Sequence, residues 1–383
     1  MTELEALRKK IDEIDRQLLP LFLERMECTS GVAEYKRKNN MAVLDRKREQ
    51  EVLQNKVSRV DEELAEPVYN FFSAIMAISR AAQKKSLGRK TAEIDLPEHF
   101  AAHEFKKNPT VVYQGVAGAY SETALMKFFG EDTKRTNVMT FAEVFDVLKE
   151  GRTDYGVLPL ENSYTGSISD VYDLLAENSF YIVGEVDVPI EHCLVGLHGA
   201  KLSDIRTVYS HEQGFMQCKS FFRDMPEIEF RPYFNTAVSA KTVAESGDKT
   251  CAAIAGKRTA ELYGLEVLAE NINQSAKNTT RFAVVAPKGI INEGCGKVSI
   301  AFTLPNESGA LSRTLSLLAA NRLNMVKIES RPRHDRNFEY MFFVDFEGNL
   351  LDIRTRHITE EIREQTSDFR ILGNYAFAGQ PGV

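Results

Sequence analysis

The N-terminal stretch TELEALRKKIDEIDRQLLPLFLERMECTSGVAEYK, residues 2–36, carries apolar rows of helical period that a cation interrupts. The apolar side chains form two neighbouring rows with a seven-residue spacing: Leu4, Ile11, Leu18 and Val32 in one, Leu7, Ile14 and Leu21 in the other. Arg25 occupies the open position of the first row, and Lys36, at about 100° per residue, returns to within roughly 20° of it. Because a desolvated cation needs an anionic partner, the pattern indicates either a small anionic ligand or salt bridges to a neighbouring helix.

Three helices are predicted for residues 1–86, with boundaries at capping and breaking residues. The signals are a capping box of Thr2 with Glu5, a kink at Pro20, a break at Asn39-Asn40, a second helix from about Asp45 to Val57, and a third helix with Pro67 in its first turn. One long helix and two shorter ones cannot easily bury their apolar faces alone. A homodimer or a higher homo-oligomer is therefore expected.

Polar residues on the later helices fall on shared helical faces: Asp45, Arg48 and Glu49 on one helix, Ser79 and Gln83 on the next. Together with Leu7-Arg8, Glu24-Arg25 and Lys36, these residues resemble the all-helical chorismate mutase family over this whole region. The resemblance implies a chorismate-binding set: Arg25, Lys36 and Arg48 on the carboxylates and ether oxygen, Glu49 on the hydroxyl, Gln83 as a donor to the ether oxygen, and Asp45 and Ser79 in support. Arg8 lies about 100° from the Arg25 face, and in the family the equivalent arginine comes from the partner subunit.

The chemistry of that family suits these residue types. Chorismate rearranges to prephenate pericyclically, without a nucleophile and without an obligatory proton transfer. A protein can contribute a preorganised cationic cage that holds the compact conformer and stabilises charge on the ether oxygen. Arg25, Lys36, Arg48 and Gln83 are the expected catalytic residues, and the region contains no histidine.

Length and composition limit the class of protein. A chain of 383 residues with 43% hydrophobic and 27% charged residues is expected to form two to three globular domains. The start lacks an apolar signal region and no long apolar run occurs, so a cytoplasmic protein with no membrane segment is expected. The net charge of −7 gives no nucleic-acid footprint. The five cysteines are scattered without metal-ligand spacing, and no metal or cofactor is expected.

Residues 87–108 are polar and are predicted to be a linker, and residues 109–287 alternate short apolar runs with helical segments. Such alternation predicts an α/β domain. The strand-like runs are Thr110–Tyr113, Tyr155–Pro159, Tyr181–Val186, Arg206–Tyr209, Ile228–Arg231, Thr250–Ala255 and Arg281–Val285. Glycines and small polar residues recur where strands are expected to lead into helices: Gly115 to Ser121, Glu161-Asn162-Ser163, Ser210 and Asn235-Thr236. Converging helix N-termini would hold carboxylates, or each residue is only an N-cap.

Several motifs of this region, in order, resemble prephenate dehydratase: Gly115-x-x-Gly118-x-Tyr120-Ser121, Pro159 to Ser163, Tyr209-Ser210-His211 with Gln217-Cys218, and Asn278-Thr279-Thr280-Arg281-Phe282. The Thr-Arg-Phe triplet is the most specific of them. Asn235-Thr236-Ala237 departs from the usual Ser-Thr-Ala, although asparagine caps a helix equally well. The resemblance implies a two-lobed α/β fold like that of periplasmic binding proteins.

That resemblance makes Thr280 the catalytic hydroxyl, which assists departure of the ring hydroxyl of prephenate as CO2 leaves. The prephenate-binding residues implied with it are Ser121, Asn162, Ser163, Ser210, Gln217, Thr236, Thr280 and Arg281. Glu161 is expected to be structural. His192 and His211 each lie beside an apolar run, which is more typical of a packed core histidine than of an acid–base group.

Residues 297–375 show strand, helix, strand, strand, helix and strand in that order, which predicts a ferredoxin-like α+β domain. Two motifs in it, Gly309-Ala310-Leu311 and Glu329-Ser330-Arg331-Pro332, resemble the amino-acid-binding ACT module of phenylalanine-regulated dehydratases. The resemblance implies that these seven residues bind L-phenylalanine at a subunit interface.

The three modules in this order resemble the bifunctional P-protein family, chorismate mutase–prephenate dehydratases, over essentially the whole chain. The resemblance implies two consecutive reactions and feedback inhibition by L-phenylalanine, their end product. Two alternatives remain open at this point: arogenate as the preferred dehydratase substrate, or a catalytically inactive amino-acid or solute sensor on the same fold.

Overall fold

The computed structural model describes residues 2–39, 41, 45–86, 100, 104–275, 277–333 and 339–379. Its contacts divide the chain into two compact units, Met1–Asp95 and Leu96–Val383. Most of the predicted linker, residues 87–99 and 101–103, lies outside the described residues. The end of that linker differs from the expectation, because Phe100 is buried against Tyr181 and Phe105 packs against Phe128 in the second unit.

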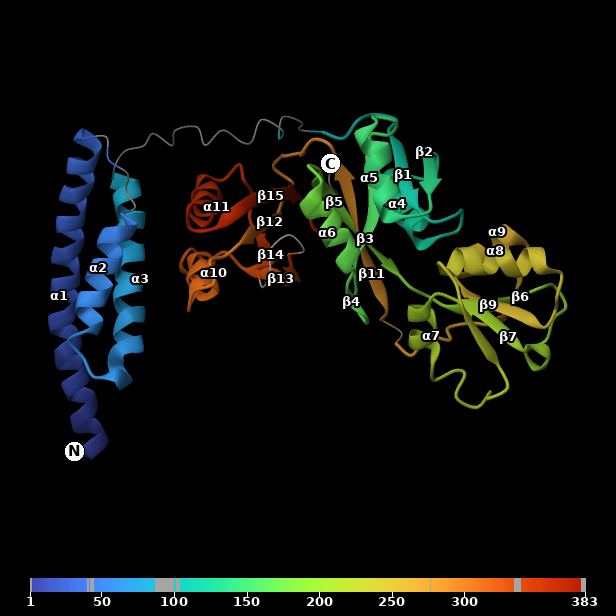
Figure 1. Cartoon of the computed structure of the whole chain (residues 1–383), viewed down its shortest axis with the longest axis horizontal. Helices are drawn as coiled ribbons and strands as arrows, with labels where there is room; N and C mark the ends of the chain where they lie inside the picture. Colours follow the sequence, from blue (N-terminus) through green and yellow to red (C-terminus); the bar gives the residue numbers. More distant parts are fainter. Residues whose placement is uncertain are drawn as a thin grey trace. The chain divides into compact units, whose positions relative to one another are not determined.

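The first unit contains the three predicted helices, α1 (Glu3–Lys38), α2 (Arg46–Val57) and α3 (Glu62–Ser86) (Figure 1). The predicted capping box is present, since the Thr2 amide donates to Glu5 Oε2 at 2.7 Å and the Glu5 amide to Thr2 Oγ1 at 3.3 Å. The predicted start of the third helix is wrong: α3 begins at Glu62 and Pro67 lies inside it. A proline in the second turn removes one helical hydrogen bond, and an acidic first turn favours the earlier start.

The apolar rows of α1 are not buried within one chain. Leu4, Leu18 and Val32 are between 45% and 56% exposed. The contact between α1 and α3 includes the C-terminal half of α1, where Arg25 donates to Ser79 of α3 and where Thr29 and Ala33 are buried. Among the described residues, neither α1 nor any other helix is long and apolar enough to cross a membrane.

The second unit begins with a lobe whose central sheet has the order β5-β11-β3-β1-β2, with β4 paired to β3. Its elements are β1 (Thr110–Gln114), α4 (Tyr120–Phe129), β2 (Lys134–Val138), α5 (Phe141–Lys149), β3 (Tyr155–Asn162), β4 (Gly166–Ser167), α6 (Ser169–Glu177), β5 (Tyr181–Pro189) and β11 (Thr279–Ala286). The predicted strands are all present. β2 was not predicted, because its sequence KRTNV is polar and lies at the sheet edge.

A second lobe contains a five-stranded sheet of order β10-β6-β9-β7-β8. Its elements are β6 (Cys193–Gly196), β7 (Thr207–Ser210), α7 (Glu212–Cys218), β8 (Glu229–Pro232), α8 (Thr236–Ser246), β9 (Cys251–Ala255), α9 (Lys257–Tyr263) and β10 (Glu266–Ala269). The chain enters this lobe through residues 190–192 and leaves it through residues 270–278. The two-lobed α/β prediction is therefore confirmed.

The C-terminal module has the predicted ferredoxin-like order, with strands arranged β13-β14-β12-β15. Its elements are β12 (Lys297–Thr303), α10 (Ala310–Ala320), β13 (Met325–Pro332), β14 (Tyr340–Glu347), α11 (Ile353–Gln365) and β15 (Ser367–Tyr375). Alternate residues of β12 face opposite sides. Ile300 packs among residues of α10 and α11, while Ala301 packs with residues of the first lobe.

The sheets of the first lobe and the C-terminal module join into one through β15 and β5, which pair in parallel at Gly373 and Ile182. A methyl group on Gly373 would overlap the carbonyl oxygen of Ile182. Glycine is therefore required at this position by the close approach of two backbones rather than by its own dihedral angles.

We expect Gly373→Ala to lower the free energy of unfolding of the second unit by on the order of 2 kcal/mol, because the two strands must separate to admit the methyl group. Denaturant unfolding followed by circular dichroism measures the change. Ser367→Ala, at the exposed start of the same strand, should stay within about 0.5 kcal/mol of the wild type. If Gly373→Ala leaves the free energy of unfolding unchanged, the pairing of β15 with β5 does not contribute to stability.

Candidate active sites

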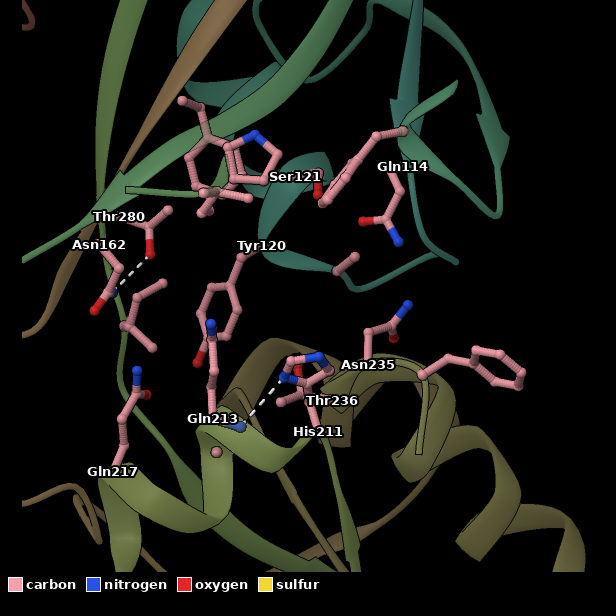
Figure 2. Close-up of a pocket in the computed structure, with 18 of the residues that line it drawn as sticks. Gln114, Tyr120, Ser121, Asn162, His211, Gln213, Gln217, Asn235, Thr236 and Thr280 are labelled. Carbon is pink, nitrogen blue, oxygen red and sulfur yellow. Dashed lines mark hydrogen bonds between the residues drawn. The ribbon is translucent and has the colours of Figure 1, made fainter. Parts of the chain in front are cut away.

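A cavity of about 310 Å³ lies between the two lobes of the second unit (Figure 2). The starts of α4, α7 and α8 line it from several sides, together with the strand residues Asn162 of β3 and Thr280 of β11. The expected convergence of helix N-termini is therefore present. Gly115 and Gly118, with φ of 114° and 86°, permit the turn that brings α4 to the cavity.

Most of the residues predicted to bind the substrate line this cavity: Ser121, Asn162, Gln217, Thr236 and Thr280. Ser163 does not; its hydroxyl donates to the Lys277 carbonyl and accepts from the Thr279 amide, which closes a surface turn. Ser210 does not either. It is fully buried under Gly214 of α7, and its hydroxyl has no hydrogen-bond partner in the described part of the chain.

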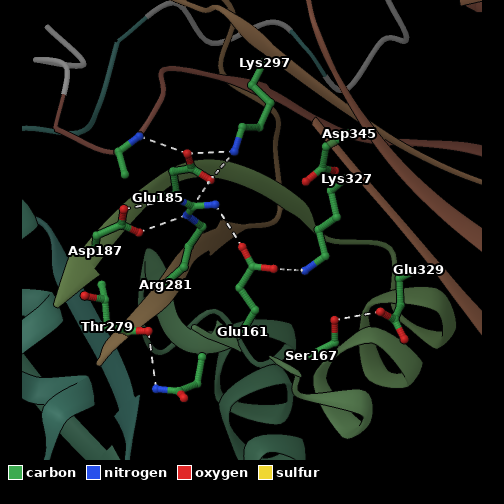
Figure 3. Close-up of polar contacts among 12 residues, drawn as sticks. Glu161, Ser167, Glu185, Asp187, Thr279, Arg281, Lys297, Lys327, Glu329 and Asp345 are labelled. Carbon is green, nitrogen blue, oxygen red and sulfur yellow. Dashed lines mark hydrogen bonds and ion pairs between the residues drawn. The ribbon is translucent and has the colours of Figure 1, made fainter. Parts of the chain in front are cut away.

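Arg281, which was also predicted to bind the substrate, does not line the cavity. Successive residues of a strand point to opposite faces, so Thr280 and Phe282 face the cavity and Arg281 faces away from it. Its guanidinium lies 2.9 Å from Asp187 and 2.9 Å from Glu161 (Figure 3). The neighbouring carboxylates raise the pKa of Arg281 against the effect of burial, which lowers it.

The ion pairs around Arg281 continue into the C-terminal module (Figure 3). Lys327 of β13 pairs with Glu161, and the buried Lys297 of β12 lies 2.7 Å from Glu185 of β5. Burial would raise the pKa of Glu161, but Lys327 and Arg281 hold it below its ordinary value. Glu161 therefore connects the strand that carries Asn162 with the C-terminal sheet, in agreement with its predicted structural role.

Asn162 is fixed by its own turn. Its Oδ1 accepts hydrogen bonds from the amides of Tyr164 at 2.9 Å and Thr165 at 3.0 Å, so its Nδ2 points to Thr280 Oγ1 at 2.9 Å. The prediction that a helix follows Glu161-Asn162-Ser163 is wrong, because a tight turn leads into β4 instead. The turn amides hold the Asn162 side chain as a helix start would have done.

Sequence reasoning assigned no substrate contact to several residues that lie at the cavity or next to it. Asn235 caps α8 through Oδ1, and its buried Nδ2 has no hydrogen-bond partner among the described residues. His211 was expected in the core, but it caps α7 at the cavity, where Nδ1 accepts from the Gln213 amide at 3.3 Å. His192 is buried as expected, yet its ring also lines the cavity. Asn278 contacts Asn162 at 2.7 Å, and its place beside the Thr-Arg-Phe triplet was the available signal.

The helical unit brings part of the other predicted set together. A guanidinium nitrogen of Arg25 donates to Ser79 Oγ, and Gln83, one turn further along α3, is buried. Lys36 is half-buried further along α1. Asp45 caps α2 by accepting from the Arg48 amide at 3.0 Å, which is a structural role.

Two residues of the helical unit differ from the implied arrangement. Glu49 is bound by Arg80, with both carboxylate oxygens 2.6 Å from one guanidinium nitrogen. Arg80 was missed because it is adjacent to Ser79 rather than on the Ser79–Gln83 face. Arg48 is exposed, and its guanidinium lies 3.4 Å from Glu51 of the same helix. Arg8, which the resemblance assigns to the site of the partner subunit, is also exposed and lies about 25 Å from Arg25 along the helix axis, at 1.5 Å per residue.

In the C-terminal module the predicted ligand residues divide between two faces of β13. Glu329 accepts from the Ser167 hydroxyl at 2.7 Å and Arg331 lies 2.7 Å from Asp173, so both contact the first lobe. Ser330 and Pro332 are exposed on the opposite side of the strand. Gly309 has φ of 75° at the start of α10, where Ala310 is buried and Leu311 is half-buried.

Comparison with known proteins places these sites in a family. Residues 7–84 match the model of chorismate mutase type II, 111–289 that of prephenate dehydratase, and 298–358 that of the ACT domain. A bifunctional chorismate mutase/prephenate dehydratase of Aquifex aeolicus is 31% identical over 98% of this chain and 98% of its own length. The chain belongs to the bifunctional chorismate mutase/prephenate dehydratase family. It is an enzyme with an isomerase domain, a lyase domain and an ACT domain.

Two further relatives match only part of this chain. An arogenate dehydratase/prephenate dehydratase of Arabidopsis thaliana is 38% identical over 69% of this chain and 71% of its own. The crystal structure of prephenate dehydratase from Arthrobacter aurescens in complex with L-Phe has 30% identity and a TM-score of 0.65, and covers 72% of this chain and 92% of that one. In the described residues no group of side chains suited to holding a metal ion was found.

Proposed function

We propose that the helical domain converts chorismate to prephenate, and that the cavity between the lobes converts prephenate to phenylpyruvate with loss of water and CO2. The observation that supports the second reaction best is the Asn162–Thr280 pair at a cavity lined by helix starts. Assaying the purified chain with chorismate, prephenate and arogenate in parallel tests the assignment. Faster turnover of arogenate than of prephenate would make arogenate the substrate of the cavity. If neither compound is turned over, the cavity would be only a binding site.

Thr280 is suited to give a proton in this reaction. Its oxygen accepts from Asn162, and no acceptor for its own proton occurs among the described residues, so the O–H is available to a ligand in the cavity. The proton passes to the ring hydroxyl of prephenate, whose C–O bond breaks with its electron pair as water forms. The electrons of the C–C bond to the ring carboxylate then make the ring aromatic as CO2 leaves. Thr280 regains a proton from water, so each turnover consumes one proton.

The carboxylates of prephenate must be held largely without cations, since the cavity lining contains no lysine or arginine among the residues that the structure describes. We assign them to the N-termini of α4 and α8, where Ser121 and Thr236 lie. Backbone N–H groups at helix starts favour anions. Asn235, at the position where the family usually has serine, adds its buried Nδ2 as a donor beside Thr236.

In the helical domain, Arg25, Lys36, Arg48 and Gln83 are proposed to form the cage around chorismate, with Ser79 holding Arg25. Arg80 joins this set through Glu49, because it fixes the carboxylate that the substrate hydroxyl would contact. No proton transfer is required. The cage acts by positioning and by stabilising charge on the ether oxygen.

A homodimer is proposed for the same domain. The exposed apolar rows of α1 need a partner surface, and Arg8 is too distant to serve the site of its own chain. Sedimentation analysis of the full chain measures the oligomeric state.

We further propose domain boundaries at 1–86, 109–287 and 297–375, and a cytoplasmic location.

L-Phenylalanine is proposed as a feedback inhibitor that binds at the ACT domain near Gly309 and the exposed side of β13. Gly309→Val should raise the L-phenylalanine concentration for half-inhibition by about tenfold, because a β-branched residue disfavours the φ of 75° found there. Gly247→Val, at φ of 67° immediately after α8, is the matched control and should leave inhibition unchanged. Equal inhibition of the Gly309→Val and wild-type enzymes would move the sensor elsewhere.

A further inference from the structure

His192 lies in the first of the two segments that cross between the lobes, and it is 3% exposed. Its amide donates to Asn273 Oδ1 at 2.9 Å, and its carbonyl accepts from the Ile272 amide at 2.9 Å. Both partners belong to the second crossing segment. Burial lowers the pKa of His192, although a hydrogen bond to Gln217 opposes that change. Burial therefore favours the neutral form of the imidazole, and backbone hydrogen bonds between the two crossing segments hold the residue in place.

A chain of side-chain hydrogen bonds leads from this imidazole to Thr280. His192 Nε2 lies 2.8 Å from Gln217 Oε1, which also accepts from Asn278 Nδ2 at 3.0 Å. Asn278 Oδ1 accepts from Asn162 Nδ2 at 2.7 Å, and Asn162 Nδ2 reaches Thr280 Oγ1 at 2.9 Å. All of these side chains are at least nine-tenths buried.

The direction of every hydrogen bond in the chain follows from its fixed end. The Tyr164 and Thr165 amides can only donate, so Asn162 presents its oxygen to them and its NH2 group to Asn278 and Thr280. Asn278 must then accept at Oδ1 and donate from Nδ2. Gln217 Oε1 is therefore the acceptor, and His192 must carry its proton on Nε2. This tautomer leaves the Gln217 amide nitrogen available to the cavity, which Gln217 lines.

We propose that His192 is a positioning residue of the dehydratase, which acts through Gln217, Asn278 and Asn162 to hold the Thr280 hydroxyl with its oxygen as acceptor and its proton directed at the substrate. The inference rests on the proposed role of Thr280. When the proton leaves, charge develops on Thr280 Oγ1, and the Asn162 N–H already directed at it stabilises that charge without reorganisation. His192 lies in a segment that crosses between the lobes. The series of hydrogen bonds from His192 to Thr280 is therefore complete only while both lobes hold their present arrangement.

His192→Leu and His192→Gln test the proposal in the full-length enzyme. A glutamine Nε2 can donate from close to the position of the imidazole Nε2, whereas leucine cannot donate. We expect His192→Leu to lower kcat for prephenate by on the order of tenfold to a hundredfold with KM little changed, and His192→Gln to recover most of that loss. A His192→Gln enzyme as slow as His192→Leu would overturn the proposal.

The same substitution in the Thr280→Ala background separates positioning from a merely structural role. If His192 acts through the Thr280 hydroxyl, His192→Leu should cost less than about twofold further in kcat once that hydroxyl is absent. The same factor in both backgrounds would overturn the proposal, and thermal unfolding of each variant detects a folding defect. If turnover falls in Thr280→Ala but not in His192→Leu, the role of His192 is rejected and the proposed function stands. If the wild-type enzyme is inactive on prephenate, the proposed function itself is rejected.

Discussion

Thr280→Ala is expected to lower kcat for prephenate by about 10² to 10⁴, the range that a positioned proton donor contributes. Thr280 is 8% exposed, and its hydroxyl accepts from Asn162 and makes no hydrogen bond as a donor among the described residues. Its removal is therefore expected to leave the leaving group without an acid. KM should change little, because the interaction is made mainly in the transition state. Steady-state formation of phenylpyruvate measures both parameters.

Two variants at the same strand sharpen this experiment. Thr280→Ser keeps a hydroxyl within reach of Asn162 and should retain a measurable part of kcat. Thr279→Ala removes an identical side chain from the adjacent position, whose hydroxyl lies 3.5 Å from the Lys277 carbonyl, and should stay within about twofold of the wild type. Mutase activity should survive in all three. An unchanged kcat in Thr280→Ala would assign proton delivery to another group.

The positions of Thr280 and Arg281 illustrate what the sequence could predict. The strand was evident from the apolar run Arg281–Val285, and the period of two within a strand already implies that Thr280 and Arg281 face opposite sides. Predicting both as ligands of one substrate contradicted that period. Arg281 instead pairs with carboxylates on β3 and β5, the strands on either side of it.

The buried network shows what local sequence could not predict. His192, Gln217 and Asn278 are 25 and 61 positions apart along the chain where they contact each other. Their meeting depends on how the two crossing segments pair, which no local pattern reports. Helix and strand boundaries, in contrast, follow from capping and periodicity, so the ferredoxin-like order of residues 297–375 was predicted element by element.

Arg25→Ala and Lys36→Ala are each expected to lower kcat/KM for chorismate by on the order of a hundredfold or more, which corresponds to about 3–4 kcal/mol of transition-state stabilisation. Arg25 is half-buried and fixed by Ser79, so its charge is held in place before a substrate binds. Prephenate dehydration should be spared, because it uses a separate compact unit. Arg16→Ala, exposed on the same helix, is the control and should keep normal turnover. Near-normal turnover in both site variants would contradict the cationic cage.

Mixing Arg8→Ala chains with Arg25→Ala chains tests whether the mutase site is shared between subunits. Each homodimer lacks a cation in both of its sites, whereas each heterodimer has one complete site and one that lacks both arginines. If equal amounts exchange freely, half of the dimers are mixed, so activity should recover to about a quarter of the wild-type value. Arg8→Ala chains that are fully active alone would show that Arg8 is not required. Inactive parents with no recovery on mixing would place Arg8 and Arg25 in the site of one chain, against their separation of about 25 Å along α1.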